Sequence, residues 1–549
     1  MTTTVIQHVL NRLADLGVSD IFGVPGDYSF SISDAVCTSS RQRWVGCSNE
    51  LNAAYAADGY ARIKGMAALC TTYGVGELSA INGIAGAYAE HLPVFHLVGT
   101  PNLKVQNSRA LMHHTLGDGE YDLFRRMAEP VACAHAVITA QNVLYETERL
   151  IAEALYHRRP VYMAFPADQA NLPVAGELVA FPAASSHAAS LSRAADAIIE
   201  ALKKAATACL LPGILVSRVG ATDALKSLVD NSGLPFATMF MAKSVLDEQH
   251  PAYVGMYDGN LMNPKVQDFV ESVELVISVG SPFTDFNSGA FTARLDPNRI
   301  IYLGHHLTKV GSVEFPNVEL KELLGVLGER VEKRSWPRIT TESMKHSLKS
   351  GEDSPITADL LYPRWASFIR EDDLVVAETG TVSMGLGFGR LPRGTSFHNQ
   401  TLWGSIGWAT PAALGVSVAA PGRRVLLFTG EGSHQLTVQE LGQFGRMGLC
   451  PVIFVLNNNG YLIERLLCKD PDIAYNDIAQ WNYTELPHAL GCNGWFTARV
   501  STSLELEDAL TEAGQASSGV YIEVVTDTYA SSKLALRLAE ALKSMRKNE

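Results

Sequence analysis

The 549-residue sequence is short of the features that mark secreted, membrane and nucleic-acid-binding proteins. Its 8 cysteines form no CxxC pair, so the sequence indicates neither a zinc site of that kind nor a disulfide framework. No apolar run approaches the ~18 residues of a membrane-spanning helix, and the amino terminus lacks a secretory signal. The net charge of -13 argues against a basic surface for nucleic acid. We therefore expect a cytoplasmic protein that binds neither membranes nor nucleic acid.

The rest of the composition is that of an ordinary globular chain. Hydrophobic residues make up 47% of the chain and charged residues 18%, and the length predicts about three domains. Residues 167–190 are rich in Pro, Ala and Ser, and residues 336–356 are polar and charged, so both segments are predicted linkers. The predicted domains are residues 1–180, 190–340 and 355–549.

Short apolar runs alternate with helical patterns, which predicts three doubly wound α/β domains with mostly parallel sheets. The middle domain lacks GxGxxG after a strand, so a dinucleotide site is not supported. Strands are expected at residues 21–24, near 45, and at 67–72, 94–98, 209–215, 236–239, 275–279, 300–303 and 374–377. Helices are expected at residues 5–16, 49–61, 80–90 and 358–369, and from 411 onward.

The most informative pattern is a strand, helix and parallel strand in the last domain. The strand at residues 425–429 ends on the turn GEGS, a helix is expected over residues 434–447, and a second strand at 451–456 ends on NNNG. Both polar turns therefore lie at the carboxyl ends of strands, where ligands of open parallel sheets bind.

The two turns offer complementary chemistry for a phosphate and a metal ion. Glu431, Asn458 and the Gly460 carbonyl provide three oxygens for a Mg2+ that is bound to phosphates. Gly432 and Ser433 let backbone amides approach an anion at the start of a helix. Either turn alone is more often an ordinary Gly/Asn turn, but the pair across one crossover favours a diphosphate bridged by Mg2+.

The GEGS turn, followed by a helix, a strand and NNNGY, resembles the diphosphate and metal motif of thiamin-diphosphate enzymes, in particular the 2-oxo acid decarboxylases. The resemblance covers essentially the whole chain. It implies thiamin diphosphate and Mg2+ as cofactors. The family usually has Asp where this chain has Glu431. The longer side chain still ligates Mg2+, and we expect it to displace the ion or weaken its binding.

The helix that follows Asn49 is rich in small residues, which predicts close approach to another backbone. Its first residue, Glu50, is by composition equally well explained as a surface residue favoured by the helix dipole. The segment NELN matches the family residue for residue. The resemblance therefore implies that Glu50 hydrogen-bonds N1′ of the cofactor's aminopyrimidine ring.

His113 and His114 are adjacent, and adjacent side chains point apart on a helix or a strand, so a shared metal is not expected. A structural loop pair is the alternative reading. Together with Asp27 in a GDY segment, the pair resembles the pyruvate and indolepyruvate decarboxylase branch. In that branch the Asp and both His line the active site as proton donors and relays.

Glu464 is the fourth candidate for proton transfer, because it follows Gly460 by one helical turn. Its apolar neighbours Ile463 and Leu467 favour a carboxyl group that acts as an acid near neutral pH. The alternative is an exposed helix residue paired with Arg465.

Three further cofactor residues rest on the resemblance alone. Thr381, which follows an ETG segment, is expected to contact the cofactor. The Gly404 carbonyl is expected to accept from the 4′-amino group, and the Ile406 side chain to hold the cofactor in a bent shape. A plain core residue is the alternative for Ile406.

The predicted size of the substrate rests on the small residue Ser383, which lies shortly after the ETG segment. Pyruvate-selective relatives carry a bulky Trp shortly after the ETG segment, whereas this chain has Thr381-Val382-Ser383. A larger pocket is predicted, lined by Ser383, Ile463 and Leu467, for aryl or branched 2-oxo acids such as indolepyruvate, phenylpyruvate and 2-oxoisovalerate.

The resemblance implies non-oxidative decarboxylation to an aldehyde and CO2, through an ylid and an enamine of the cofactor, which acts as the electron sink. It also implies a homotetramer, a dimer of dimers, with active sites between subunits. Pyruvate decarboxylase and an acetolactate synthase-like carboligase are the alternatives, although the latter group lacks the His pair, as does benzoylformate decarboxylase. An NAD-dependent dehydrogenase would need GxGxxG, and a silent cofactor-binding protein would have lost Glu50.

Overall fold

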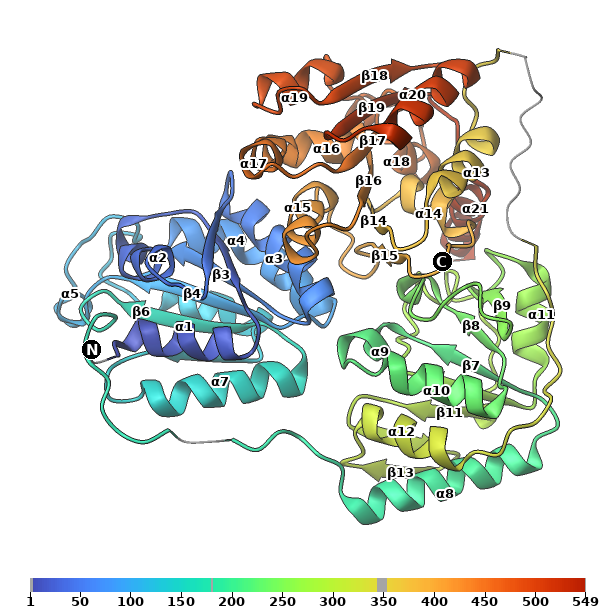
Figure 1. The fold of residues 1–549 in the computed structure, drawn as a ribbon, viewed down its shortest axis with the longest axis horizontal. Helices are drawn as coiled ribbons and strands as arrows, with labels where there is room; N and C mark the ends of the chain where they lie inside the picture. Colours follow the sequence, from blue (N-terminus) through green and yellow to red (C-terminus); the bar gives the residue numbers. More distant parts are fainter. Residues whose placement is uncertain (1–2, 179–180, 343–352, 549) are drawn as a thin grey trace. The chain divides into compact units, whose positions relative to one another are not determined.

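The alternation of apolar runs and helical patterns folds into three α/β sheets (Figure 1). The computed structural model describes residues 3–178, 181–342 and 353–548, and within them the sheets have six, seven and six strands. The predicted fold class is confirmed. Parts of both predicted linkers, residues 179–180 and 343–352, lie outside the described residues.

The amino-terminal sheet is wholly parallel, with the order β2-β1-β3-β4-β6-β5. Its central strands are buried along their whole length because helices cover both faces. The strands are β1 (Asp20–Gly23), β2 (Arg43–Gly46), β3 (Ala67–Thr72), β4 (Val94–Thr100), β5 (Ala134–Val137) and β6 (Val161–Pro166). The helices are α1 (Val5–Asp15), α2 (Phe30–Cys37), α3 (Glu50–Lys64), α4 (Val75–Ala89), α5 (Leu103–Asn107), α6 (Leu123–Ala128) and α7 (Val143–His157).

Helix α3 packs against α15 (Ala409–Ala419) through small residues. A Cβ atom added to Gly59 would collide with the backbone of Ala412, and one added to Gly415 would collide with the Ala56 carbonyl. The two backbones therefore touch, and the close approach predicted for this helix is confirmed. Both helices belong to one compact unit, which comprises residues 1–183, 410–422 and 437–449.

The central sheet has the order β13-β12-β11-β10-β7-β8-β9, with β12 and β13 antiparallel to their neighbours. The strand expected at residues 209–215 is too long: it ends at Pro212, and α9 begins at Ile214, because Pro212 and Gly213 interrupt the run. The strands are β7 (Ala208–Pro212), β8 (Phe236–Thr238), β9 (Tyr253–Met256), β10 (Leu275–Val279), β11 (Ile300–Leu303), β12 (Leu307–Val310) and β13 (Val313–Pro316). The helices are α8 (Ala188–Lys204), α9 (Ile214–Arg218), α10 (Thr222–Ser232), α11 (Pro264–Ser272) and α12 (Leu320–Arg330).

The carboxy-terminal sheet is parallel, with the order β15-β14-β16-β17-β19-β18. Its core includes Phe428 and Phe454, whose rings stack with 5.0 Å between centroids. The strands are β14 (Leu374–Ala377), β15 (Ser396–His398), β16 (Val425–Gly430), β17 (Val452–Asn457), β18 (Phe496–Val500) and β19 (Val520–Val525). The helices besides α15 are α13 (Ala358–Phe368), α14 (Thr381–Gly387), α16 (Glu431–Thr437), α17 (Leu441–Met447), α18 (Leu462–Leu467), α19 (Leu486–Ala489), α20 (Ser503–Gln515) and α21 (Lys533–Asn548).

The single helix expected over residues 434–447 is wrong in two respects. It begins earlier, at Glu431, and a 3-10 turn over Val438–Glu440 divides it into α16 and α17. At the break the buried carboxylate of Glu440 accepts hydrogen bonds from the Ser48 amide and from Asn52 Nδ2. The break in the helix thus coincides with a tertiary contact.

The second predicted linker is anchored at both ends. Trp336 is buried in the central core, and its indole N–H donates to the Ser232 carbonyl. Ile356 is buried in the carboxy-terminal core, and its amide donates to the Ser501 carbonyl.

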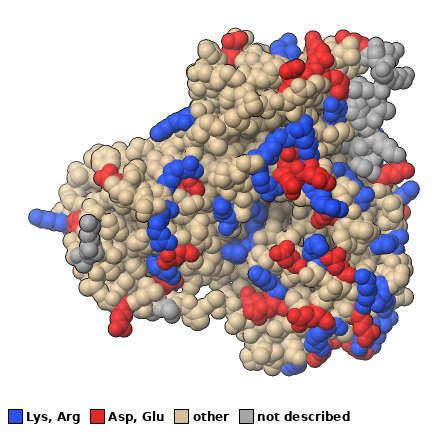
Figure 2. Space-filling model, in the orientation of Figure 1, with Lys and Arg blue, Asp and Glu red and all other residues tan. Residues whose placement is uncertain are grey.

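Charge on the drawn face and the length of the described helices bear on binding to nucleic acid and membranes. On the face drawn in Figure 2, acidic and basic side chains are mixed. Among the described residues, no helix is long and apolar enough to cross a bilayer.

Candidate functional site

Three neighbouring strands of the carboxy-terminal sheet end on polar segments. Glu378 to Thr381 follow β14, Glu431 follows β16, and Asn458 follows β17. The strands are parallel, so these segments share one edge of the sheet. The structure therefore brings together the residues of the predicted diphosphate and metal motif.

Glu431 opens α16 and is only 1% exposed. Its Oε1 atom accepts a hydrogen bond of 2.6 Å from the Gly460 amide, whereas its Oε2 atom is buried and has no hydrogen-bond partner. Burial raises the pKa of Glu431 to about 7, against the opposing effect of the Gly460 and Asn458 amides.

The buried, unpartnered oxygen of Glu431 fits a bound cation, because a metal ion would supply the interaction that the protein does not. Carboxylate, amide and carbonyl oxygens are the ligands that Mg2+ prefers. Asn458 is 5% exposed, and Gly460 is held next to the carboxylate by its own amide. The donor set is therefore suitable for Mg2+.

Two glycines of this motif allow close packing. A Cβ atom on Gly432 would lie 2.8 Å from Cδ1 of the Tyr461 ring, and one on Gly460, where φ is +139°, would collide with the Asn476 carbonyl. Ser433, the third residue of α16, is 8% exposed. Side chains larger than glycine at residues 432 and 460 would displace the loop that carries Asn458.

The predicted substrate residues lie where α14 meets α18. Ser383 is buried, and its hydroxyl donates to the Gly380 carbonyl at 3.2 Å. A Cβ atom on Gly380 would lie 3.8 Å from Cγ2 of Ile463, so both helices border the same region. Thr381 is buried, and its carbonyl accepts from the Tyr362 hydroxyl.

An apolar cluster lies beside these residues. Its members come from the central domain and from α14, α18 and α21, and they include Phe240, Met384, Ile463, Leu534 and Leu538. Leu467 is half-buried on the same helix as Ile463. This cluster is the apolar wall that a pocket for a large side chain would need.

The other predicted site residues of this unit are less deeply buried. Gly404 has φ of +67° and is half-buried, as is Ile406. Glu464 is exposed, so Ile463 and Leu467 do not bury its carboxylate within this unit. Arg465, the alternative partner of Glu464, instead pairs with Asp477 at 2.7 Å.

The proton-transfer candidates Asp27, His113 and His114 come together in the amino-terminal sheet's unit. His113 Nε2 lies 2.7 Å from Asp27 Oδ2, and the His113 ring stacks on Tyr28 with 4.9 Å between centroids. His114 Nδ1 is buried and has no hydrogen-bond partner. The geometry pairs the Asp27 carboxylate with His113, and the His114 ring lies beside that pair.

The expectation that the two histidines point apart is wrong. Their ring centroids are 4.7 Å apart, and ligand atoms of Asp27, His113 and His114 all lie within 4.8 Å of one another. The reason is the backbone: His114 has φ of +62°, so the pair belongs to a turn and neither to a helix nor to a strand.

Glu50 is half-buried at the first position of α3, where the side chain of Asn49 caps the helix. A Cβ atom on Gly76 would lie 3.2 Å from Glu50 Oε1 and 3.1 Å from Thr72 Cγ2. The glycine therefore leaves the space in which the Glu50 carboxylate lies, at the carboxyl ends of β2 and β3.

Sequence reasoning missed two buried carboxylates that position these segments. Glu440 binds the Ser48 amide and Asn52 Nδ2, and so fixes the turn before Glu50; burial raises its pKa. Glu378 accepts from the amides of Thr379 and Ala409, and burial raises its pKa to about 7. A charged residue inside an otherwise apolar pattern was the available signal for both.

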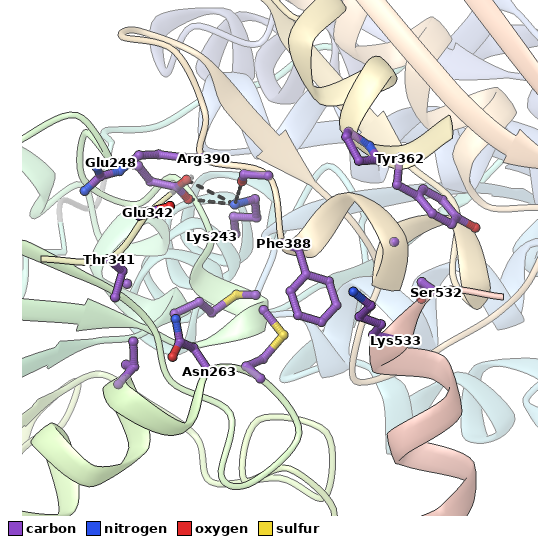
Figure 3. A pocket seen from close by; sticks show the side chains of 18 of the residues that line it. Lys243, Glu248, Asn263, Thr341, Glu342, Tyr362, Phe388, Arg390, Ser532 and Lys533 are labelled. Carbon is purple, nitrogen blue, oxygen red and sulfur yellow. Dashed lines mark hydrogen bonds and ion pairs between the residues drawn. The ribbon is translucent and has the colours of Figure 1, made fainter. Parts of the chain in front are cut away.

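A cavity of about 410 Å3 lies elsewhere in the second unit, which comprises residues 184–409, 423–436 and 450–549. Figure 3 shows Lys243 and Glu248 on one side of this cavity and Tyr362 and Lys533 on the other. None of the predicted site residues lines it. Size alone therefore does not identify the site; the polar strand ends do.

Models of one protein family match three stretches of the chain. The thiamine pyrophosphate enzyme N-terminal TPP-binding domain matches residues 3–120, the central domain matches 195–324, and the C-terminal TPP-binding domain matches 378–524. The three matches fall on the three sheets in order along the chain.

Relatives and a solved structure extend the match to nearly the whole chain. An alpha-keto-acid decarboxylase of Mycobacterium tuberculosis strain H37Rv is 41% identical, over 95% of this chain and 94% of its own. One of Mycobacterium leprae is 39% identical, over 95% and 92%. An X-ray structure described as a thiamin diphosphate-dependent enzyme from Mycobacterium smegmatis has a TM-score of 0.75 at 22% identity, and covers 95% of this chain and 99% of its own.

Proposed function

We propose that this chain, which belongs to the thiamine pyrophosphate enzyme family, removes CO2 from 2-oxo acids and releases the aldehyde. The observation that carries the proposal is the likeness, along nearly the whole chain, to mycobacterial proteins named alpha-keto-acid decarboxylase. The arrangement of Glu431, Asn458 and Gly460 at one sheet edge supports the same reading.

The residues that would hold the cofactor lie in both units. Glu431, Asn458 and Gly460 would hold Mg2+, and the amino end of α16, with Gly432 and Ser433, would receive the diphosphate. The remaining proposed contacts, on the aminopyrimidine and thiazolium side, are Glu50, Thr381, Gly404 and Ile406. Thiamin diphosphate, when bound, supplies the electron sink for loss of CO2.

The chain's own part is to hold and move protons. Glu50 would hold a proton against the aminopyrimidine. The Asp27–His113 pair, at 2.7 Å, would pass a proton to or from the substrate, with His114 beside it and Glu464 as a further donor. Ser383 is small, and Ile463 belongs to an apolar cluster at the neighbouring helices, so we propose that an aryl or branched side chain is accepted here, as in indolepyruvate, phenylpyruvate or 2-oxoisovalerate.

We also propose that the active enzyme is a homotetramer with active sites between subunits. Four of the proposed catalytic and cofactor residues, Asp27, Glu50, His113 and His114, fall in one compact unit, and the rest fall in the other. If the two halves of a site come from different copies, dilution should lower specific activity in step with dissociation. Activity and sedimentation measured over the same concentration range test this.

The first experiment is aldehyde release from pyruvate, 2-oxoisovalerate, phenylpyruvate and indolepyruvate, with and without thiamin diphosphate and Mg2+. Cofactor-dependent turnover that is fastest with the large acids supports both the reaction and the substrate class. Turnover that is fastest with pyruvate keeps the reaction but contradicts the open pocket at Ser383. No decarboxylation by protein shown to hold the cofactor contradicts the proposal and favours a carboligase.

A matched pair of variants separates Glu50 from general damage to its helix. Glu50→Gln keeps the size of the side chain but removes its charge, and we expect kcat to fall at least ~100-fold, in the range of general acid–base effects. Lys64→Gln lies at the exposed end of the same helix and should leave kcat unchanged. Equal activity of Glu50→Gln and wild type would remove Glu50 from the mechanism.

A further inference from the structure

We propose that the central domain carries a zinc-type metal site made by His305, His306 and Glu319. The two histidines lie in the turn between β11 and β12, and Glu319 is the residue before α12. All three side chains are half-buried. No step of the proposed decarboxylation uses them, so the site is separate from the one described above.

The side chains already have nearly the spacing of ligands around one ion. Ligand atoms of the three residues all lie within 4.8 Å of one another. His306 Nδ1 lies 2.8 Å from Glu319 Oε1 and 3.0 Å from Oε2. Two ligands at ~2.1 Å from a tetrahedral zinc ion are roughly 3.4 Å apart, so replacing the shared proton by the ion needs a movement of about half an ångström.

The histidine rings are also side by side. The ring centroids of His305 and His306 are 3.8 Å apart, with 24° between the ring planes. Adjacent residues of a strand would place their rings on opposite faces. Here the turn between the strands places both rings on one side, so a small rotation of each ring lets both nitrogens point at one ion.

The backbone holds the two segments together before any metal binds. The Val318 amide donates to the His306 carbonyl, and the Leu320 amide donates to the His305 carbonyl. The Glu319 amide donates to Ser186 Oγ at 2.8 Å. These bonds fix the distance between the turn and the start of α12. Binding of an ion therefore costs little conformational entropy, because the backbone of both segments is already ordered.

The position of Glu319 supports a role outside the helix. Glu319 is the N-cap residue of α12, yet its side chain makes no capping hydrogen bond and turns instead to His306. The positive end of the helix disfavours a nearby cation only weakly. That penalty is small beside the free energy with which imidazole and carboxylate ligands hold zinc.

The ligand types decide which ion the site takes. Two imidazoles and a carboxylate suit Zn2+, with Co2+ or Ni2+ as substitutes, and leave a fourth position for water. Mg2+ prefers oxygen ligands and keeps its waters, so it should not compete. The chain would thus sort two metals: Mg2+ at Glu431 and zinc in the central domain.

The test is equilibrium dialysis of the full-length enzyme with Zn2+ in excess Mg2+, followed by metal analysis. Wild type is compared with His305→Gln, His306→Gln and Glu319→Gln, and each variant is checked for an unchanged Tm without zinc. Asp27, His113 and His114 form a second cluster that could take zinc. The expected result is therefore that each of the three variants binds one equivalent of zinc per chain less than wild type does, whatever the total amount of zinc that wild type binds.

His250→Gln is the matched control. His250 Nε2 lies 2.9 Å from Asp230 Oδ1, which is another half-buried histidine–carboxylate pair of the central domain, but no second histidine stands beside it in the sequence. We expect this variant to keep the zinc that the others lose, and wild-type binding to weaken as the pH falls, because protonated imidazole has no free lone pair. Full retention of zinc by the Glu319 and histidine variants, or no zinc bound by wild type, would overturn the proposal.

Discussion

At the scale of single residues, several buried carboxylates hold backbone segments in place. Glu431, Glu378, Glu440 and Glu77 are each at most 3% exposed, and each accepts hydrogen bonds from backbone amides. A buried carboxylate with amide donors holds a loop in place, because removing it would leave those donors unsatisfied. Only Glu431 lies in the motif that would bind a metal.

Removing the charge of Glu431 should weaken Mg2+ binding. Glu431→Gln can still accept from the Gly460 amide, so the loop should stay in place while the ion loses a negative ligand. We expect the half-saturating Mg2+ concentration for turnover to rise roughly tenfold or more. A Mg2+ titration of cofactor-dependent activity measures this; the exposed Glu485→Gln in the same unit is the control, and an unchanged requirement would exclude Glu431 as a ligand.

Glu77 makes stability depend on pH. Burial raises its pKa to about 7, although the Gly74 amide and the Tyr162 hydroxyl both donate to it. Between pH ~4.5 and ~7 the folded chain keeps a proton that the unfolded chain releases, so its contribution to the free energy of unfolding falls as the pH rises.

Glu77→Gln should therefore resemble wild type near pH 5 and become the more stable of the two near pH 7.5. The difference should approach about 3 kcal/mol at most. Urea unfolding midpoints at the two pH values measure it. A difference that is independent of pH would mean that Glu77 is ionised in the folded chain throughout this range.

At the scale of elements, small residues determine how closely two helix backbones can pack. The packing of α3 against α15 depends on Gly59 and Gly415, where no Cβ atom fits. By contrast, Gly325 in α12 has nothing within 4 Å of its Cβ position and has ordinary helical backbone angles. The same change of glycine to alanine should thus have opposite effects at two helices.

Gly59→Ala should destabilise the chain by about 1–3 kcal/mol through overpacking. Gly325→Ala should stabilise it by up to ~1 kcal/mol, because alanine has the higher helix propensity. Thermal unfolding of both variants against wild type measures this. Equal shifts in Tm would show that α3 can move away from α15 at little cost.

The sequence predicted those elements whose signals are local. Strands β3, β10, β11 and β14 begin and end at the expected residues, because each is a short and mostly apolar run. The break between α16 and α17 could not be predicted, since it coincides with a contact of Glu440 with Ser48, 392 positions away in the sequence, which no local pattern reveals. The approach of His113 to His114 depends on one positive φ, which the residue type does not reveal.

At the scale of the whole molecule, a buried ion pair ties the central sheet to the carboxy-terminal sheet. The side chains of Lys243 and Glu248 are each 1% exposed, and Lys243 Nζ lies 2.9 Å from Glu248 Oε1 (Figure 3). Lys243 also donates to the Gly389 carbonyl, and Glu248 accepts from the Leu391 amide. One pair thus joins a loop after β8 to the segment after α14.

Breaking this pair should be costly, whereas neutralising both partners should not. Lys243→Met leaves Glu248 as a buried, unpaired charge and should destabilise the chain by about 3–5 kcal/mol. Lys243→Met with Glu248→Gln keeps an acceptor for the Leu391 amide and should recover most of that loss. Thermal unfolding of the single and double variants tests this; no recovery in the double variant would mean that the packing of Lys243, and not its charge, stabilises the join.

The chain crosses between its two compact units several times. Residues 410–422 and 437–449 belong with the amino-terminal sheet, although the residues on either side of each belong with the other two sheets. A gene fragment that ends at residue 183 would therefore encode a sheet without the helix that meets Gly59. Exchange of whole domains at the linkers would therefore separate segments that belong to one compact unit.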